Sequence, residues 1–374
     1  MQKQTAIFLF SMLLTGCAQN SNLSSITWNN DSKLPNTNNI EHLGVAGPIT
    51  GIINRKLFIA GGANFPEGMP WDGGKKQYPE TGYLYSIENG KLHFDKEFDF
   101  NLALAYPGNT TDGNLLYTAG GENENGPSNK VFSYELNDKN EVIHNELPNL
   151  PEPLTNAGLV YADHSLYLVG GENSSEVSDK IYKLDLNQNN ASWKVFLTLP
   201  YPISTAVIVS DQKENIYIAG GRKRNENSKS TIYDQVLKLS LKDKSINTIT
   251  KLKQATAAGT GIIYKGNLIL FAGDNASTFH KVEQLIGEIN LSKNEEEKKD
   301  LINKKNQIQS NHPGFTSEVW AFNLKEESWY SLDSITAASP VTTTALLYQD
   351  YVFIPSGEIK VGVRTNQILI GKLN

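Results

Sequence analysis

A short apolar segment that ends in two small residues recurs along this chain of 374 residues and limits its fold more than any other feature. Leu57–Gly62 and Leu166–Gly171 show the pattern clearly, with apolar residues running directly into a pair of glycines. The pairs that begin at Gly120, Gly170 and Gly220 follow one another at intervals of 50 residues. A repeat of this period indicates similar units that bury their apolar faces against one another. We therefore expect one large repetitive core rather than two unrelated domains.

Six copies of the segment are present, ending at Gly62, Gly121, Gly171, Gly221, Gly273 and Gly357. A complete unit reads as four strands: 157–161, the segment before the glycine pair, 181–184, and an outer stretch with Trp193 and Leu199. The glycines are expected to let strands approach closely near an axis. The pattern resembles the kelch repeat, and six copies predict an all-β, six-bladed kelch-type β-propeller.

The two ends of the chain are predicted to meet in the last blade. The final copy retains only one strand-like segment after its glycine, at residues 365–373. Near the other end, Trp28 precedes Leu34 by the same six residues that separate Trp193 from Leu199. The N-terminal strand is therefore expected to supply the missing outer strand and close the last blade.

Residues 275–312 lengthen the fifth unit and have the character of a helical insertion. Apolar residues recur at helix-like spacing within Val282–Ile289, and a run rich in Glu and Lys follows at 293–305. We expect this insertion either to cap one mouth of the central channel or to be a solvated excursion without a role.

The first residues resemble a bacterial secretory leader. Lys3 precedes an apolar run at 5–14 that is too short to span a bilayer. The run ends in Leu14–Cys17, which resembles the lipobox, where the cysteine is lipidated and the chain is cut just before it. The predicted organisation is a lipoprotein signal peptide at 1–16, a tether at 17–25 and the propeller at 26–374.

Lipidation of Cys17 would attach an exported protein to a membrane, in the periplasm or cell envelope, by its lipid alone. Ala18 after the cysteine favours the outer membrane by the enterobacterial sorting habit. The alternative is an ordinary signal peptide with a stray or buried cysteine. Because Cys17 is the only cysteine, the exported body is expected to rely on packing rather than disulfides.

Candidate site residues follow the small-residue pairs, because equivalent positions of successive blades form a ring around the axis of a propeller. These positions hold Ala63, Glu122, Glu172, Arg222, Asp274 or Asn275, and Glu358. Three glutamates and an arginine facing one funnel suggest a binding or catalytic site. The alternative for Glu122 and Glu172 is a structural role, as loop carboxylates bonded to backbone N–H groups.

One local string sharpens this expectation. Residues 357–365 read Gly-Glu-Ile-Lys-Val-Gly-Val-Arg-Thr and resemble the G-E-x-K-x-G-x-R-T signature of the N-acetylneuraminate epimerase family. That family consists of exported six-bladed kelch propellers that interconvert the anomers of sialic acid. The resemblance implies that Glu358 is the catalytic acid/base and that Arg364 holds the carboxylate of the sugar acid.

The order of the blades differs from the best-known form of the family, in which the signature lies mid-chain. Here the signature ends the chain, and the blade that usually follows it, with Ala60–Phe65 and Gly74–Tyr78, comes near the N-terminus. The chain thus resembles a cyclically permuted branch, and a closed ring of blades tolerates such a change.

One substrate-side arginine of the family has no match, because this chain reads Pro-Tyr-Pro-Ile-Ser at 200–204. Arg222 or Arg224 could supply the missing charge from a neighbouring loop. Arg222, Glu122 and Glu172 are therefore further candidate substrate ligands.

Other functions are disfavoured or remain as alternatives. A net charge of −6 argues against nucleic acid as a partner. The Ser-x-Asp-x-Gly-x-Thr-Trp boxes of sialidases are absent, and a copper radical oxidase would need a cysteine in its site. The six histidines lack metal-ligand spacing, so neither a metal nor another cofactor is expected. A non-catalytic kelch lipoprotein that binds carbohydrate or protein is the remaining alternative.

Overall fold

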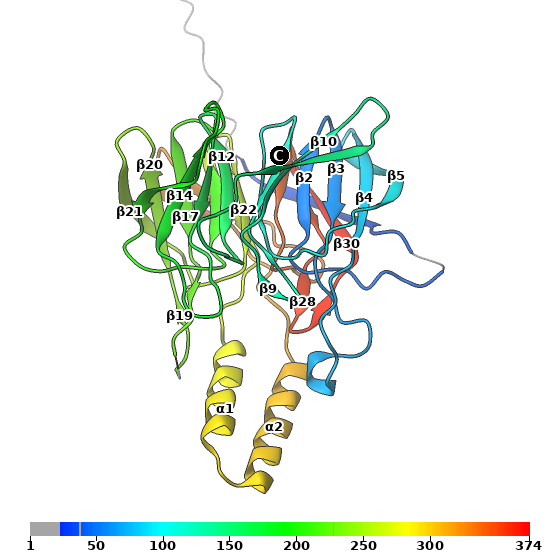
Figure 1. Ribbon diagram of the computed structural model, residues 1–374, viewed down its shortest axis with the longest axis vertical. Coiled ribbons are helices and arrows are strands. Elements are labelled where there is room, and N and C mark those ends of the chain that lie inside the picture. The colour runs from blue at the N-terminus through cyan, green and yellow to red at the C-terminus, as the bar shows by residue number, and fades with distance from the viewer. Residues whose placement is uncertain (1–22, 37–38, 227) are drawn as a thin grey trace, which may run out of the picture.

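The computed structural model describes residues 23–36, 39–226 and 228–374, and these form six four-stranded antiparallel sheets around a central axis (Figure 1). The first three blades comprise β2 (Ile49–Ile53), β3 (Lys56–Ala60), β4 (Thr81–Glu88) and β5 (Lys91–Asp99); β6 (Gly108–Thr111), β7 (Leu116–Ala119), β10 (Val131–Leu136) and β11 (Val142–Leu147); and β12 (Gly158–Ala162), β13 (Ser165–Val169), β14 (Lys180–Asp185) and β15 (Lys194–Thr198).

The other three blades complete the ring. They comprise β16 (Val207–Ser210), β17 (Asn215–Ala219), β20 (Gln235–Ser240) and β21 (Ser245–Lys251); β22 (Thr260–Tyr264), β23 (Asn267–Phe271), β24 (Val319–Asn323) and β25 (Ser328–Leu332); and β26 (Leu346–Tyr348), β27 (Tyr351–Pro355), β30 (Gln367–Leu373) and β1 (Ile26–Lys33). The six-bladed propeller predicted from the repeats is confirmed.

The N-terminal strand closes the ring as predicted. Strand β1 pairs antiparallel with β30, with Ile26 opposite Leu373. The indole Nε1 of Trp28 donates to the carbonyl of Asp333, just as Trp193 donates to a carbonyl of the blade before its own. The two tryptophans therefore have the same structural role, which is why their sequence offsets match. This closure ties residues more than 300 positions apart into one sheet.

The small-residue pairs are required by the backbone. Gly120 has a φ of 69°, and a Cβ there would lie 2.2 Å from the carbonyl oxygen of Leu154. The crowding therefore comes from the chain entering the next blade, and the expected close approach of strands at the axis is not its cause. In the last two copies Ala272 and Ser356 keep the left-handed conformation, with φ values of 54° and 56°.

Apolar side chains fill the spaces between neighbouring blades. Phe58 and Phe100 of the first blade pack against Tyr134 of the second. At the closure, Trp28 packs against Phe271 of the fifth blade. Because every blade contacts two others in this way, the core is a continuous ring and removal of one strand exposes the faces of its neighbours.

The insertion in the fifth blade is helical, as predicted. It forms a hairpin of α1 (Phe279–Leu291) and α2 (Glu295–Ser310). Asn294 caps α2, because its side chain accepts from the N–H groups of Glu296 and Glu297. The hairpin extends from the end of the propeller that carries β9 (Gly126–Pro127), β19 (Thr231–Ile232) and β28 (Glu358–Lys360) (Figure 1).

Side-chain contacts hold the hairpin to other blades. Glu283 of α1 accepts from the N–H and hydroxyl of Ser230, in the fourth blade. Asn306 of α2 donates to the carbonyl of Trp71, in the short 3-10 helix η1 (Pro70–Asp72) of the first blade. The hairpin thus contacts the first and fourth blades at one end of the propeller.

The predicted signal peptide at 1–16 and the lipidation site Cys17 lie outside the described residues. Within the described part of the chain, neither helix combines the length and the apolar character that crossing a membrane requires.

Candidate active site

The residues after the small-residue pairs occupy equivalent positions in all six blades. Each makes an antiparallel bridge with the chain that enters the innermost strand of its own blade. The bridged pairs are Ala46 with Ala63, Ala105 with Glu122, Thr155 with Glu172, Ser204 with Arg222, Ala257 with Asp274, and Val341 with Glu358. The structure thus places the predicted candidates on one ring, with Asp274 rather than Asn275 at the fifth position.

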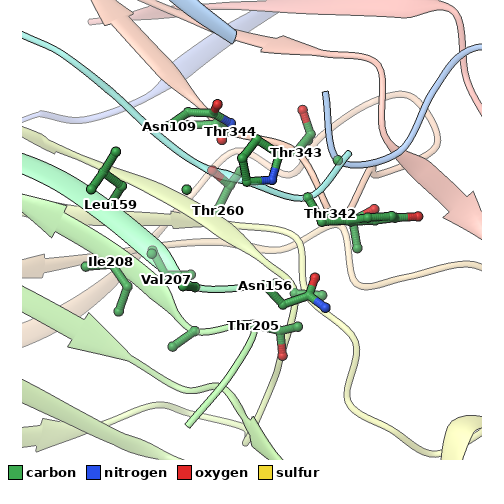
Figure 2. Close-up of a pocket in the computed structure, with 18 of the residues that line it drawn as sticks. Asn109, Asn156, Leu159, Thr205, Val207, Ile208, Thr260, Thr342, Thr343 and Thr344 are labelled. Atoms are coloured by element: carbon green, nitrogen blue, oxygen red, sulfur yellow. The ribbon is translucent and has the colours of Figure 1, made fainter. Parts of the chain in front are cut away.

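A second ring of residues forms the floor of this funnel. Its six members pass backbone hydrogen bonds of 2.7–3.1 Å from blade to blade until the circle closes, and their φ values lie between 52° and 61°. They are Gly47, Tyr106, Asn156, Thr205, Ala258 and Thr342. The ring surrounds a cavity of about 130 Å³ in the central channel (Figure 2). Six mutually supporting hydrogen bonds offset the cost of the left-handed backbone.

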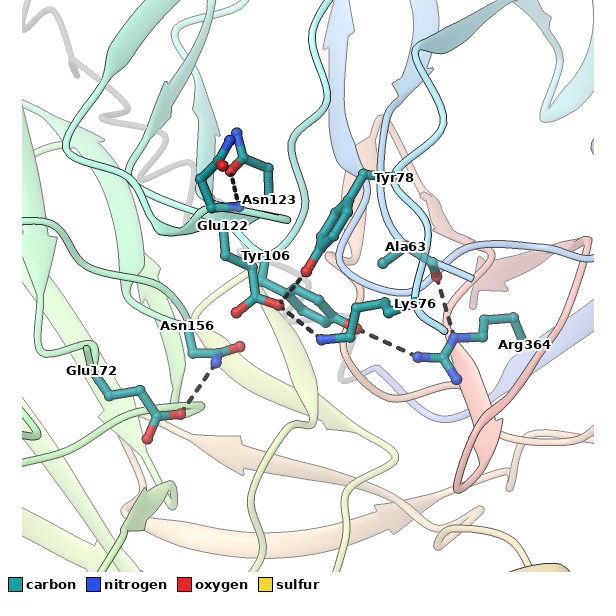
Figure 3. Close-up of polar contacts among 10 residues, drawn as sticks. Ala63, Lys76, Tyr78, Tyr106, Glu122, Asn123, Asn156, Glu172 and Arg364 are labelled. Atoms are coloured by element: carbon teal, nitrogen blue, oxygen red, sulfur yellow. Dashed lines mark hydrogen bonds and ion pairs between the residues drawn. The ribbon is translucent and has the colours of Figure 1, made fainter. Parts of the chain in front are cut away.

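Sequence reasoning missed this floor, although its residues recur just before each inner strand. Two of its side chains reach the ring of candidate residues. Tyr106 extends toward Arg364 and Asn156 toward Glu172 (Figure 3). Gly47 leaves space for Tyr106, because a Cβ on Gly47 would lie 2.4 Å from the Tyr106 ring.

Glu358 and Arg364 lie on one small hairpin, formed by β28 and β29 (Val363–Arg364). The register places them directly opposite each other, so both side chains lie on one face. Gly362, with a φ of 75°, makes the turn, and its N–H donates to Oε1 of Glu358 at 2.7 Å. The glycine of the sequence signature therefore both turns the chain and holds the carboxylate.

The Glu358 carboxyl is in a setting that favours its protonated form. Burial raises its pKa, and the charge of Asp274 acts in the same direction. The charges of Arg364 and Lys76 and the N–H of Gly362 oppose this only in part. A raised pKa makes this carboxyl a stronger proton acceptor than an ordinary glutamate, which suits a general acid/base.

Arg364 is nearly fully enclosed, with 4% of its side chain exposed. Its Nε donates to the carbonyl of Ala63 at 3.2 Å, and its guanidinium lies 4.6 Å from the ring centre of Phe65. Its Nη2 makes a long hydrogen bond of 3.5 Å to the Tyr106 hydroxyl. Nη1 is buried without a hydrogen-bond partner in the described residues, 3.9 Å from Glu358 Oε1. Such a fixed group is suited to receive a carboxylate ligand.

Arg222 and Glu172 bind each other across two blades. Nη2 of Arg222 lies 2.8 Å from Oε1 of Glu172, which also accepts from Asn156 at 3.2 Å. The Arg222 guanidinium packs 5.2 Å from the ring centre of Phe279 in α1. Arg224 instead donates to carbonyls of the neighbouring loop, those of Asn173 and Ser174.

Glu122 is held by two groups of the long loop between β3 and β4. Oε1 of Glu122 lies 2.8 Å from Nζ of Lys76 and 3.1 Å from the Tyr78 hydroxyl (Figure 3). The carboxylates of Glu122 and Glu172 thus bond side chains, so the expectation of bonds to backbone N–H groups was wrong. Sequence reasoning also missed Lys76 as a site residue, although it lies in the Gly74–Tyr78 segment that resembles the family.

Asp274, the neighbour of Glu358 on the ring, accepts from the N–H of Ala276. Burial raises the pKa of its carboxyl, against the opposing charges of His312, His280 and Arg222. Across the residues that the structure describes, no cluster of His, Cys, Asp or Glu has the arrangement of a metal site.

Comparisons with known proteins agree with this geometry. The family model "N-acetylneuraminate epimerase" matches residues 147–374. Two curated relatives carry the same name, from Salmonella enteritidis PT4 (strain P125109) and Salmonella typhi. Each is 23% identical over 167 residues, which are 44% of this chain and 42% of the relative. The chain thus aligns with less than half the length of these relatives.

A solved structure, "Structure of YjhT", is similar over 92% of this chain and 100% of its own, with a TM-score of 0.63 and 14% identity. This likeness concerns the propeller fold. The family model covers more than half of the chain and includes the string with Glu358 and Arg364. The chain therefore belongs to the N-acetylneuraminate epimerase family.

Proposed function

We propose that this protein is a mutarotase that interconverts the α and β anomers of N-acetylneuraminate by acid/base-catalysed ring opening and closure. One observation carries the proposal: Glu358, a partly buried carboxyl with a raised pKa, lies 3.9 Å from Nη1 of the buried Arg364, and this Nη1 has no hydrogen-bond partner among the described residues. The family supplies the substrate class, because its name states the sugar acid.

The reaction needs little more than controlled proton transfer. A sialic acid is a cyclic hemiketal. Its anomeric hydroxyl loses a proton, the bond between the anomeric carbon and the ring oxygen breaks, and the ring oxygen gains a proton. The open-chain ketone then recloses on its other face. Glu358, with water as a relay, can accept the first proton and return it, which is worth about 10²–10⁴-fold in rate.

Arg364 would hold the substrate while the ring opens and closes. A planar guanidinium binds a carboxylate through two parallel hydrogen bonds, which fixes orientation as well as position. Ala63 and Phe65 already hold Arg364 in place, so little side-chain entropy is lost on binding. The anomeric carbon bears this carboxylate, and Arg364 therefore brings it close to Glu358.

The proposal is tested by time-resolved NMR of anomer exchange in freshly released α-N-acetylneuraminate. Glu358→Gln keeps size and hydrogen bonding but cannot titrate, so exchange should slow by at least about 10²-fold while substrate still binds. Arg364→Lys should chiefly weaken binding, by roughly 1.5–3 kcal/mol.

Two outcomes would contradict the proposal. If the parent protein binds the sugar acid without accelerating exchange, it is a binding protein. If Glu358→Gln exchanges anomers as fast as the parent, Glu358 is not the acid/base.

A further inference from the structure

We propose that Lys76 is a second cationic group for the substrate carboxylate, beside Arg364, and that Glu122 is a positioning residue for Lys76 rather than a ligand. This inference rests on the proposed function and specifies how its site recognises an anion.

Lys76 and Arg364 converge on one tyrosine of the funnel floor. Nζ of Lys76 lies 5.1 Å from the ring centre of Tyr106, and Nη2 of Arg364 lies 3.5 Å from the hydroxyl of the same residue (Figure 3). Backbone hydrogen bonds to Gly47 and from Asn156 fix Tyr106 in the floor. The two cations are thus held at a common wall, although they come from different blades of the folded chain.

The charges of this wall favour an anionic ligand. Lys76 and Arg364 bring two cationic groups to this wall, and Glu122 lies 2.8 Å from one of them, Nζ of Lys76. Burial lowers the pKa of Lys76, but Glu122 and Tyr106 outweigh it and the net shift is upward, so Lys76 stays protonated. Nη1 of Arg364 has no hydrogen-bond partner among the described residues, so a carboxylate bound beside Arg364 and Lys76 would complete its contacts.

The hydrogen bonds of Glu122 hold Lys76 in place. Its Oε1 receives both Lys76 Nζ and the Tyr78 hydroxyl. Burial and the charge of Glu122 raise the pKa of Tyr78, so Tyr78 remains a phenol that donates. Two backbone hydrogen bonds between Asn64 and Gln77 fix the chain next to Lys76. The lysine therefore has a defined direction while 35% of its side chain stays exposed to ligand and solvent.

The experiment compares two adjacent lysines and two ligands. Lys76→Gln and the control Lys75→Gln, an exposed position on the same loop, are titrated with N-acetylneuraminate and with its methyl ester, with binding followed by NMR. Lys76→Gln should weaken binding of the acid about tenfold, as expected for one charged hydrogen bond, and leave the uncharged ester within about twofold. Lys75→Gln should change neither, and Lys76→Arg should restore part of the affinity.

Glu122 is tested by a double variant. If Glu122 acts only through Lys76, Glu122→Gln should weaken acid binding less than Lys76→Gln does, and adding it to Lys76→Gln should cause no further loss. Independent, additive losses would show that Glu122 contacts the ligand and would overturn its positioning role.

The failures can be told apart. If the parent binds the acid but Lys76→Gln binds it equally well, or loses acid and ester alike, this inference fails and the proposed function stands. If the parent binds neither ligand, the proposed function fails and the inference fails with it. An unchanged melting temperature of Lys76→Gln shows that the comparison is made on folded protein.

Discussion

Two glutamate–arginine pairs face the same funnel, and they differ in how closely they pair. Glu172 and Arg222 lie 2.8 Å apart, whereas Glu358 and Arg364 lie 3.9 Å apart. Each arginine also packs over a phenylalanine ring, Phe279 for Arg222 and Phe65 for Arg364. Both pairs contain the same residue types, and both glutamates lie on the same ring. Any difference in reactivity between the two pairs must therefore come from their other contacts.

The difference lies in what holds each carboxylate. Oε1 of Glu172 accepts from both Arg222 and Asn156, whereas its Oε2 has no hydrogen-bond partner among the described residues. Glu358 accepts from the Gly362 N–H, and Arg364 is held back from it by the carbonyl of Ala63. Removing one member of a directly hydrogen-bonded ion pair destabilises the fold. The separated pair instead keeps a titratable carboxyl and an arginine whose Nη1 has no hydrogen-bond partner among the described residues.

Removing the arginine from each pair should give the largest difference in the free energy of unfolding. Arg222→Met leaves the Glu172 carboxylate, 8% exposed, without its partner and should lower the free energy of unfolding by about 2–3 kcal/mol. Arg364→Met should cost less, because Glu358 makes no direct hydrogen bond to Arg364 and keeps its hydrogen bond from the Gly362 N–H. Urea unfolding at pH 7 measures both values.

Equal losses from the two variants would contradict the distinction between a directly hydrogen-bonded pair and a separated pair. The double variant Glu172→Gln with Arg222→Met serves as control, because it should recover part of the loss by removing the unpaired charge.

Replacing the glutamate of each pair by glutamine should change stability in opposite directions, lowering it at Glu172 and raising it at Glu358. Glu172→Gln weakens a charge-assisted hydrogen bond and should cost about 1–2 kcal/mol at pH 7. Glu358→Gln should stabilise the protein at pH 7, because the raised pKa shows that folding disfavours the Glu358 carboxylate.

The stability difference between Glu358→Gln and the parent should depend on pH. A carboxyl with a raised pKa stabilises the fold below its ordinary value of 4.5, and this stabilisation is lost as the pH rises toward the shifted pKa. The advantage of Glu358→Gln should therefore grow above pH 4.5 and level off once the carboxyl is ionised in the folded protein. Melting temperatures of parent and variant from pH 4 to 8 measure it, and a variant less stable than the parent at pH 7 would contradict it.

The smallest effects should come from the rings beneath the arginines. A cation–π contact is worth about 0.5–1 kcal/mol at exposed sites and about 2 kcal/mol when desolvated, and leucine keeps much of the packing. Phe65→Leu should weaken binding of N-acetylneuraminate a few-fold by loosening Arg364, with little change in stability. Phe279→Leu should instead lower the melting temperature slightly and leave binding unchanged. If both variants affected binding equally, Arg222 would also belong to the substrate site.

Much of the architecture could be predicted because it is encoded locally. The small-residue pairs mark a backbone conformation that each blade needs, and the Trp28 offset marks the outer strand. The Glu358–Arg364 string forms its own hairpin, so its register follows from a few adjacent residues. The helical insertion was likewise visible in its apolar spacing.

Contacts between blades could not be predicted in the same way. Lys76 and Glu122 are 46 positions apart, and Arg222 and Glu172 are 50 apart. Side-chain identity alone could not show that Glu172 would form a direct ion pair with Arg222. Nor could it show that Lys76 would reach the same tyrosine as Arg364.

The sequence by itself determined the six blades, the closing strand and the placement of Glu358 opposite Arg364, because each depends on periodicity or on short-range turn geometry. Only the tertiary structure decided which charges pair and which stay available. Closure of the ring brings loops of different blades to one axis, where small differences in distance separate an ion pair of 2.8 Å from one held open at 3.9 Å. At such distances in a partly buried site, electrostatic energies depend on the position of each atom, which residue order does not encode.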